Sequence, residues 1–172
     1  MPILPTGINK ETGFTMVELL VVLAVMAIIS GTVIIAMGPA LRDARLRTGC
    51  RTIMAALNYA RSHAVTERTD TRVIFANDGN GVHVEEITAD DRGEDVIRPV
   101  TTPAGRFHRL PDNVTMLVVK NSSVNENWIR FTELGQAENA LIRIDDNYGR
   151  TWTVVVDAIT GRGEVLQAED EE

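Results

Sequence analysis

The hydrophobic residues of this chain change their spacing twice. From residue 19 to residue 41 they run almost without interruption, and no Asp, Glu, Lys or Arg occurs among them. From residue 42 to residue 68 they recur every three or four positions, and beyond residue 70 they alternate with polar residues. These patterns predict, in order, an apolar helix, an amphipathic helix and a series of half-buried strands.

The apolar run is long enough to span a membrane. At about 1.5 Å rise per residue it covers roughly 34 Å, and the hydrocarbon core of a bilayer is about 30 Å thick. Ser30, Gly31 and Thr32 interrupt the run, but transmembrane helices tolerate such residues. A secretory signal peptide is the alternative, but its apolar region is shorter and ends in small residues around a cleavage site. We therefore predict a retained transmembrane helix at residues 14–41.

The amphipathic segment at residues 42–68 is expected to continue this helix and to pack one stripe against a sheet. Arginines and polar residues occupy its other faces, as is typical of a helix that covers a core. A helix lying on the membrane surface is the alternative, although strands follow that can cover the stripe. The expected stripe consists of Leu46, Cys50, Ile53, Met54, Leu57, Ala60, Ala64 and Val65.

The remainder of the chain predicts an antiparallel sheet of many short strands. Asn77-Asp78-Gly79-Asn80-Gly81 has the composition of a hairpin turn, and residues 88–106 are expected to form a polar loop. The fold class is therefore α+β, with a long N-terminal helix packed on a β-sheet or sandwich. The predicted strands are 71–75, 82–87, 114–119, 128–131, 141–144, 151–156 and 164–167.

Composition argues against two classes of function. The 172 residues carry a net charge of −7, and the chain ends in an acidic run at 168–172, so a general affinity for nucleic acid is not expected. Cys50 is the single cysteine, which excludes an intrachain disulfide. Because it falls among apolar helix positions, we predict a buried packing thiol rather than a redox group.

No arrangement of side chains indicates an enzyme. His63, His83 and His108 are scattered and stand beside no nucleophile. Carboxylates gather at 90–95 and at 145–147, and calcium binds such oxygen clusters. Neither segment has the spacing of an EF-hand, so solvated acidic loops are expected. We predict no catalytic residue, no metal and no cofactor.

Glu18 lies at the start of the apolar helix, where a charge costs a few kcal/mol. It stands five residues after Gly13, which precedes Phe14. This Gly-Phe junction, the spaced Glu and the spanning helix together resemble the class III signal of type IV pilins and pseudopilins. The resemblance implies that a prepilin peptidase cuts after Gly13 and methylates the new N-terminus, Phe14. It also implies that the helix serves as membrane anchor and assembly element.

Glu18 has a physical reason to be in such a helix. When neighbouring helices stack with a stagger, the N-terminal amine of one subunit can pair with the carboxylate of another, and pairing offsets the desolvation of both charges. We predict that Glu18 sets register in this way; a carboxylate resting among lipid headgroups is the alternative. The arginines at 42, 45, 47 and 51 would by themselves favour a cytoplasmic C-terminal domain, whereas the resemblance places Gly13 in the cytoplasm and that domain in the periplasm.

The C-terminal third narrows the resemblance. Residues 129–135, Tyr148-Gly149-Arg150 and Thr160-Gly161-Arg162 resemble the GspH/FimT/FimU branch, which contains minor pseudopilins of type II secretion and minor pilins of type IV pili. This branch implies paired sheets on the long helix and a place near the filament tip. The predicted regions are a leader at 1–13, a transmembrane assembly helix at 14–41, its amphipathic continuation at 42–68, a periplasmic β-rich domain at 69–167 and an acidic tail at 168–172.

The leading hypothesis is a minor pseudopilin, a structural subunit that initiates or caps a type II secretion pseudopilus. Its expected partners are other major and minor pseudopilins, the prepilin peptidase, the inner membrane, and secreted cargo or the secretin. The same resemblance leaves a type IV minor pilin for pilus assembly or DNA uptake as the alternative. The net charge of −7 argues against DNA binding, although a local patch of Arg143, Arg150 and Arg162 could override it. A membrane-anchored periplasmic enzyme or solute-binding domain is a third hypothesis.

Overall fold

The structure is a computed structural model that describes residues 14–90, 92–120 and 127–167, except for the side chains of residues 31–37, 39 and 167. The chain divides into two compact units, Met1–Ala40 and Leu41–Glu172. The predicted leader at 1–13 and acidic tail at 168–172 lie outside the described residues.

The first unit contains the beginning of helix α1 (Met16–Glu67). Thr15 caps it: the backbone N–H of Glu18 donates to the Thr15 hydroxyl at 3.2 Å, and the N–H of Leu19 donates to the Thr15 carbonyl at 3.2 Å. Among the described residues, no helix combines the length and the hydropathy that a membrane span requires. The predicted transmembrane segment includes side chains at 31–37 and 39, which lie outside the described residues.

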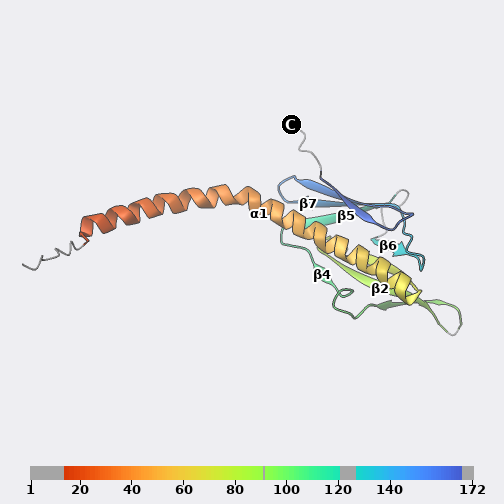
Figure 1. The fold of residues 1–172 in the computed structure, drawn as a ribbon. Coiled ribbons are helices and arrows are strands. Elements are labelled where there is room, and N and C mark those ends of the chain that lie inside the picture. Colours follow the sequence, from red (N-terminus) through yellow and green to blue (C-terminus); the bar gives the residue numbers. More distant parts are fainter. Residues whose placement is uncertain (1–13, 91, 121–126, 168–172) are drawn as a thin grey trace, which may run out of the picture. The chain divides into compact units, whose positions relative to one another are not determined.

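The second unit combines residues 41–67 of α1 with two antiparallel sheets, drawn in Figure 1. The predicted α+β fold, a long N-terminal helix on antiparallel sheets, is therefore confirmed. Strands β6 and β8 have the predicted bounds. One sheet has the order β3 (Asp95–Pro99), β2 (Gly81–Ala89), β1 (Asp70–Phe75), β6 (Trp128–Phe131), with β4 (His108–Arg109) also paired to β2; the other has the order β5 (Val114–Lys120), β7 (Ala140–Asp146), β8 (Thr151–Val156), β9 (Gly163–Gln167).

The buried stripe of the helix follows the predicted spacing of three and four residues. Six of the predicted side chains are buried, Met54 packs against the same core, and Ala56 joins them. The prediction that Val65 belongs to the stripe is wrong, because its side chain is 47% exposed. Successive helix residues are about 100° apart, so Val65 points away once Ala64 takes the core position. The six predicted and buried residues are Leu46, Cys50, Ile53, Leu57, Ala60 and Ala64.

Both sheets contribute to one core beneath the helix. In β5 and β7, buried and outward-facing residues alternate along most of each strand, as expected for a sheet with one covered face. The hydroxyl of Thr71 in β1 donates to the helix carbonyl of Ala60 at 3.0 Å. On the other sheet, Val114 lies against Gly49 of the helix. The helix thus contacts both sheets and holds them together.

The prediction of a loop at 88–106 is wrong in part. Strand β2 extends to Ala89, and β3 pairs with it, for example Ile87 with Ile97. The side chain of Asp90 closes the turn between them by accepting the N–H of Arg92 at 2.8 Å and of Glu94 at 2.9 Å. Because most of β3 is exposed, its residues show no alternation that sequence reasoning can detect. Beyond the predicted loop, His108 and Arg109 form the short strand β4.

Candidate assembly site

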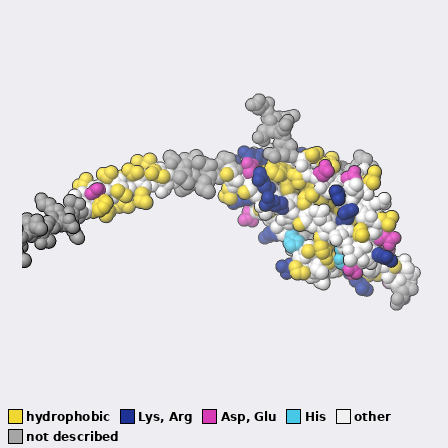
Figure 2. Space-filling model, in the orientation of Figure 1, with side chains coloured by type: hydrophobic (Ala, Val, Ile, Leu, Met, Phe, Trp, Pro, Cys, Tyr) yellow, Lys and Arg dark blue, Asp and Glu magenta, His cyan; other side chains and the backbone are white. Residues whose placement is uncertain are grey.

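The helix of the first unit exposes hydrophobic side chains in every direction. They occupy consecutive positions, so they cannot belong to one stripe. Figure 2 shows hydrophobic side chains covering the visible face of this helix. A helix that is hydrophobic all round is normally enclosed by a core, a membrane or other helices. The exposed side chains are Phe14, Met16, Val17, Leu19, Leu20, Val21, Val22, Leu23, Val25, Met26, Ile28 and Ile29.

Glu18 occupies the first turn of this helix. Its backbone N–H donates to the Thr15 hydroxyl. Thr15 and Glu18 have the spacing of a capping box, a motif that the sequence-based prediction did not include. A carboxylate in the first turn is favoured by the helix dipole. None of the ion pairs among the described residues involves the Glu18 carboxylate. Phe14 lies nearby in sequence and is 77% exposed, whereas Gly13 lies outside the described residues.

In the second unit, the turn between β7 and β8 contacts the first residues of this unit's part of α1. The guanidinium of Arg42 lies 3.6 Å from the ring centre of Tyr148, and Arg150 pairs with Asp43. Asp146 shapes the turn, because one of its carboxylate oxygens accepts the N–H groups of Tyr148 and Arg150 at 2.8 and 2.9 Å. Sequence reasoning missed Arg42 and Asp43, since they meet residues more than a hundred positions away.

The acidic segment at 145–147 therefore has a structural role in this turn. Asp145 accepts hydrogen bonds from Arg143 at 3.0 Å and from the Thr151 hydroxyl at 2.6 Å. In the part of the chain that the structure describes, no group of three or more His, Cys, Asp or Glu is arranged to hold a metal ion. These carboxylates are thus used to build the hairpin.

Two glycines of the C-terminal motifs bring their turns into contact. Gly135 and Gly161 have positive φ angles of 76° and 61°. A Cβ added to Gly161 would lie 2.2 Å from the carbonyl oxygen of Gly135. The guanidinium of Arg61 donates to that same carbonyl at 3.3 Å. The motifs at 129–135 and 160–162 therefore fasten two turns to the helix, and Arg61 is a third participant that sequence reasoning missed.

Asp157 closes the second of these turns. Its carboxylate accepts the backbone N–H and the hydroxyl of Thr160, each at 2.8 Å. These hydrogen bonds favour the ionised form and lower the pKa of Asp157 below its ordinary value. The Thr160-Gly161-Arg162 motif is thus the end of a side-chain-stabilised turn that leads into β9.

The arginines proposed for a basic patch are largely engaged. Arg143 pairs with Asp145 at 3.0 Å, and Arg150 pairs with Asp43. Arg162 is exposed in front of β9. Two of the three positive charges are therefore balanced by a neighbouring carboxylate, which weakens their attraction for a phosphate backbone.

Two of the histidines lie beside carboxylates, and the single cysteine is buried. His63 lies 3.4 Å from Glu86, and His83 lies 3.4 Å from Glu85. Cys50 is only 2% exposed, and burial raises the pKa of its thiol to about 11. A thiol with this pKa is almost fully protonated at neutral pH and is a poor nucleophile. The prediction of a buried packing thiol is confirmed.

Comparison with known proteins agrees with this arrangement. The model of the family described as type II transport protein GspH matches residues 50–161, more than half of the chain. The prokaryotic N-terminal methylation motif matches residues 8–34, which include Gly13, Phe14 and Glu18. A comparison with curated protein sequences gives no match.

The fold is similar to that of several solved structures, including a minor pseudopilin and a minor pilin. The minor pseudopilin EpsH from the type 2 secretion system of Vibrio cholerae matches 74% of this chain and 99% of its own, with 11% identity and a TM-score of 0.59. The type IV minor pilin FimU of Pseudomonas aeruginosa matches 74% of this chain and 91% of its own, with 18% identity and a TM-score of 0.51. At these identities the likeness concerns the fold.

The family match extends over most of the globular unit and complements the N-terminal motif. Pseudopilins are structural subunits, not enzymes. The methylation motif implies processing by a prepilin peptidase and anchoring in the inner membrane before assembly, and the family implies association with the secretion machinery. The predicted family and function are therefore confirmed: the chain belongs to the GspH family of minor pseudopilins of the type II secretion system.

Proposed function

We propose that this minor pseudopilin enters the pseudopilus through its N-terminal helix, after cleavage behind Gly13 and methylation of Phe14, and that Glu18 sets its register there. It stands at or near the filament tip, where it initiates or caps assembly. Its partners along the helix are the other major and minor pseudopilins, and its globular domain lies in the periplasm, accessible to cargo or the secretin.

The observation that carries this proposal is the hydrophobic surface of the first unit. Leu19, Leu20, Val21 and Val22 are all between 47% and 59% exposed, although they point in different directions. Enclosing a side chain of this size contributes about 1.5–3 kcal/mol. A bilayer encloses the helix before assembly, and neighbouring helices enclose it afterwards. The same surface therefore serves as anchor and as assembly interface.

Glu18 makes this interface selective. An unpaired ion in apolar surroundings costs several kcal/mol, whereas a well-placed opposite charge offsets much of that cost. Its carboxylate has no ion-pair partner among the described residues. A positively charged N-terminal amine of a neighbouring subunit supplies one. A subunit out of register leaves both charges unpaired and is rejected.

The alternative of a DNA-uptake pilin has less support. The likeness to FimU concerns the fold alone, and Arg143 and Arg150 already pair with Asp145 and Asp43. The net charge of −7 adds long-range repulsion towards a phosphate backbone. Salt-sensitive DNA binding by the full-length chain in detergent would shift the proposal towards DNA uptake.

Replacing the carboxylate tests the proposal. In cells that carry the secretion system, Glu18→Ala should be processed and inserted in the membrane but should co-purify poorly with other pseudopilins. Removing one partner of a buried pair costs about 3 kcal/mol or more, which corresponds to roughly a hundredfold loss in association. Glu67→Ala is the matched control, because Glu67 is an exposed carboxylate at the far end of the same helix.

Intact-mass spectrometry of the same samples monitors processing. Both variants should begin at a methylated Phe14, whereas a Gly13→Val variant should remain an uncleaved and unassembled precursor. Undiminished co-purification of the correctly processed Glu18→Ala protein would refute the register role of Glu18. A processed Gly13→Val protein would show that the leader ends elsewhere.

A further inference from the structure

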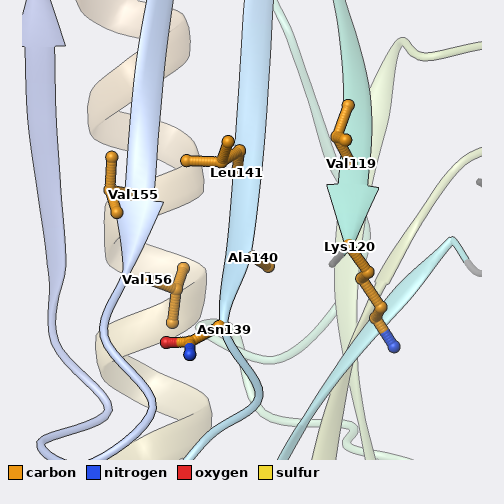
Figure 3. A pocket seen from close by; sticks show the side chains of 7 residues that line it. All are labelled: Val119, Lys120, Asn139, Ala140, Leu141, Val155 and Val156. Carbon is orange, nitrogen blue, oxygen red and sulfur yellow. The ribbon is translucent and has the colours of Figure 1, made fainter. Parts of the chain in front are cut away.

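The sheet formed by β5, β7, β8 and β9 has a second face, turned away from the core, that carries aliphatic side chains. Strand pairing sets Val119 beside Leu141, and Leu141 beside Val155. Figure 3 shows these three side chains on neighbouring strands. Leu141 is 45% exposed, whereas Ile142, the next residue along β7, is fully buried. We name this surface the outer face and define it by Leu117, Val119, Leu141, Val155 and Leu166.

The outer face is hollowed at the end where β5 and β8 finish. One hollow of about 470 Å³ is lined by Val119, Leu141 and Val155, together with Asn139. A second hollow of about 490 Å³ shares Asn139 and Val155 with it. Volumes of this size are typical of clefts that receive a ligand or an anchoring side chain. The two hollows adjoin each other, so one extended segment can occupy both.

The two hollows differ in their chemistry. The first is lined mainly by aliphatic side chains, with Lys120 and Asn139 at its edge, whereas the second is also lined by Asp157, Thr160, Arg162 and Glu164. The Asp157 carboxylate accepts two hydrogen bonds from Thr160, which favour its ionised form, and Glu164 is an exposed residue of β9. The two carboxylates outnumber the single guanidinium, so the second hollow favours a positively charged occupant.

Neighbouring basic groups do not reverse this preference. Arg143 pairs with Asp145 on the same face. The ammonium of Lys120 lies 2.6 Å from Glu138 and 3.8 Å from the ring centre of Trp128. Neither cation therefore offsets the excess of carboxylates in the second hollow.

We propose that the outer face docks an extended segment of a partner protein in which branched aliphatic side chains are followed by Lys or Arg. The aliphatic side chains enter the first hollow against Leu141 and Val155, and the basic side chain pairs with Glu164 and Asp157 in the second. This contact uses none of the helix residues proposed for assembly. It is a separate surface, and a failure of either proposal leaves the other standing.

Site-specific photo-crosslinking of the full-length chain tests the docking segment. A photoreactive phenylalanine analogue at Leu141, in cells that assemble the secretion system, should give a crosslinked protein product. Mass spectrometry should map the crosslink to an extended segment with aliphatic residues next to Lys or Arg. The same analogue at Ile97, which is 44% exposed on strand β3 of the other sheet, is the control and should give no such product.

Charge reversal tests the second hollow. Glu164→Lys should reduce the yield of the Leu141 crosslink about fivefold, the effect expected from losing one exposed pair and adding repulsion. Glu133→Lys reverses an exposed charge outside the hollows and should leave the yield unchanged. Equal products at Leu141 and Ile97 would overturn the proposal, and so would an unchanged yield in Glu164→Lys. A crosslink to lipid, to a second copy of this chain or to a segment without basic residues would overturn it as well.

Discussion

Replacing Gly161 with alanine measures how closely the two C-terminal turns are packed. Gly161 has a φ angle of 61°, and an added Cβ would lie 2.2 Å from the carbonyl oxygen of Gly135 and 3.1 Å from Cδ of Arg61. A backbone oxygen cannot move aside as a flexible side chain can. The alanine must therefore push the two turns apart or weaken the hydrogen bond from Arg61 to Gly135.

Gly149 provides a matched control for the backbone effect. Its φ angle is 86°, but an added Cβ would meet no atom within 4 Å. Alanine at a left-handed position costs about 1–2 kcal/mol, part of which is offset by the lower entropy of the unfolded chain. We expect Gly149→Ala to lose about 1 kcal/mol. Gly161→Ala adds an overpacking cost of about 1–3 kcal/mol, for a total of about 2–4 kcal/mol.

Thermal unfolding of the full-length protein in detergent provides the assay. The chain contains 2 tryptophans, and both Trp128 and Trp152 belong to the globular unit. Their fluorescence therefore follows that unit alone. With about 3–4 °C per kcal/mol for a domain of this size, Gly149→Ala should lower Tm by about 3–4 °C and Gly161→Ala by about 6–16 °C. Equal shifts for the two variants would refute the close contact between the turns.

Two further predictions concern protonation. Because the pKa of Cys50 is about 11, about one thiol in a thousand is ionised at pH 8. The folded protein should therefore react with iodoacetamide far more slowly than the urea-unfolded protein. Equal rates would contradict the burial of Cys50. The pKa of Asp157 is lowered in the folded state from an ordinary value of 3.8, so its stabilising contribution is complete above pH 3.8 and is lost as the pH falls below that value. Tm measured against pH should fall less steeply below pH 3.8 in Asp157→Asn than in the wild type, and identical slopes would show that Asp157 does not contribute.

The local sequence patterns were sufficient to predict the main helix and strands of the fold. The stripe from Leu46 to Ala64 repeats every three or four residues and is buried as predicted, because the helical period alone decides which side chains share a face. Strands β5 and β7 alternate for the same kind of reason. The junction at Gly13 and Phe14 with the carboxylate of Glu18 indicated the family, since this signal is a continuous run of residues.

Edge strand β3 was not predictable in the same way. It is exposed on both sides for most of its length, so no periodic burial marks it, and its pairing with β2 depends on backbone hydrogen bonds. Val65 shows the opposite limit: an apolar residue satisfied the sequence pattern, but the three-dimensional stripe already ended with Ala64.

The sequence by itself thus determined the helix, most strands, the buried cysteine and the family, because each depends on residues close together in the chain. Only the tertiary structure decided which charges pair, which turns touch and which face of the second sheet stays open. Asp43 meets Arg150, Arg61 meets Gly135, and Leu141 lies exposed beside Val155. Such contacts join distant segments, and a pattern that repeats every two or four residues carries no information about them.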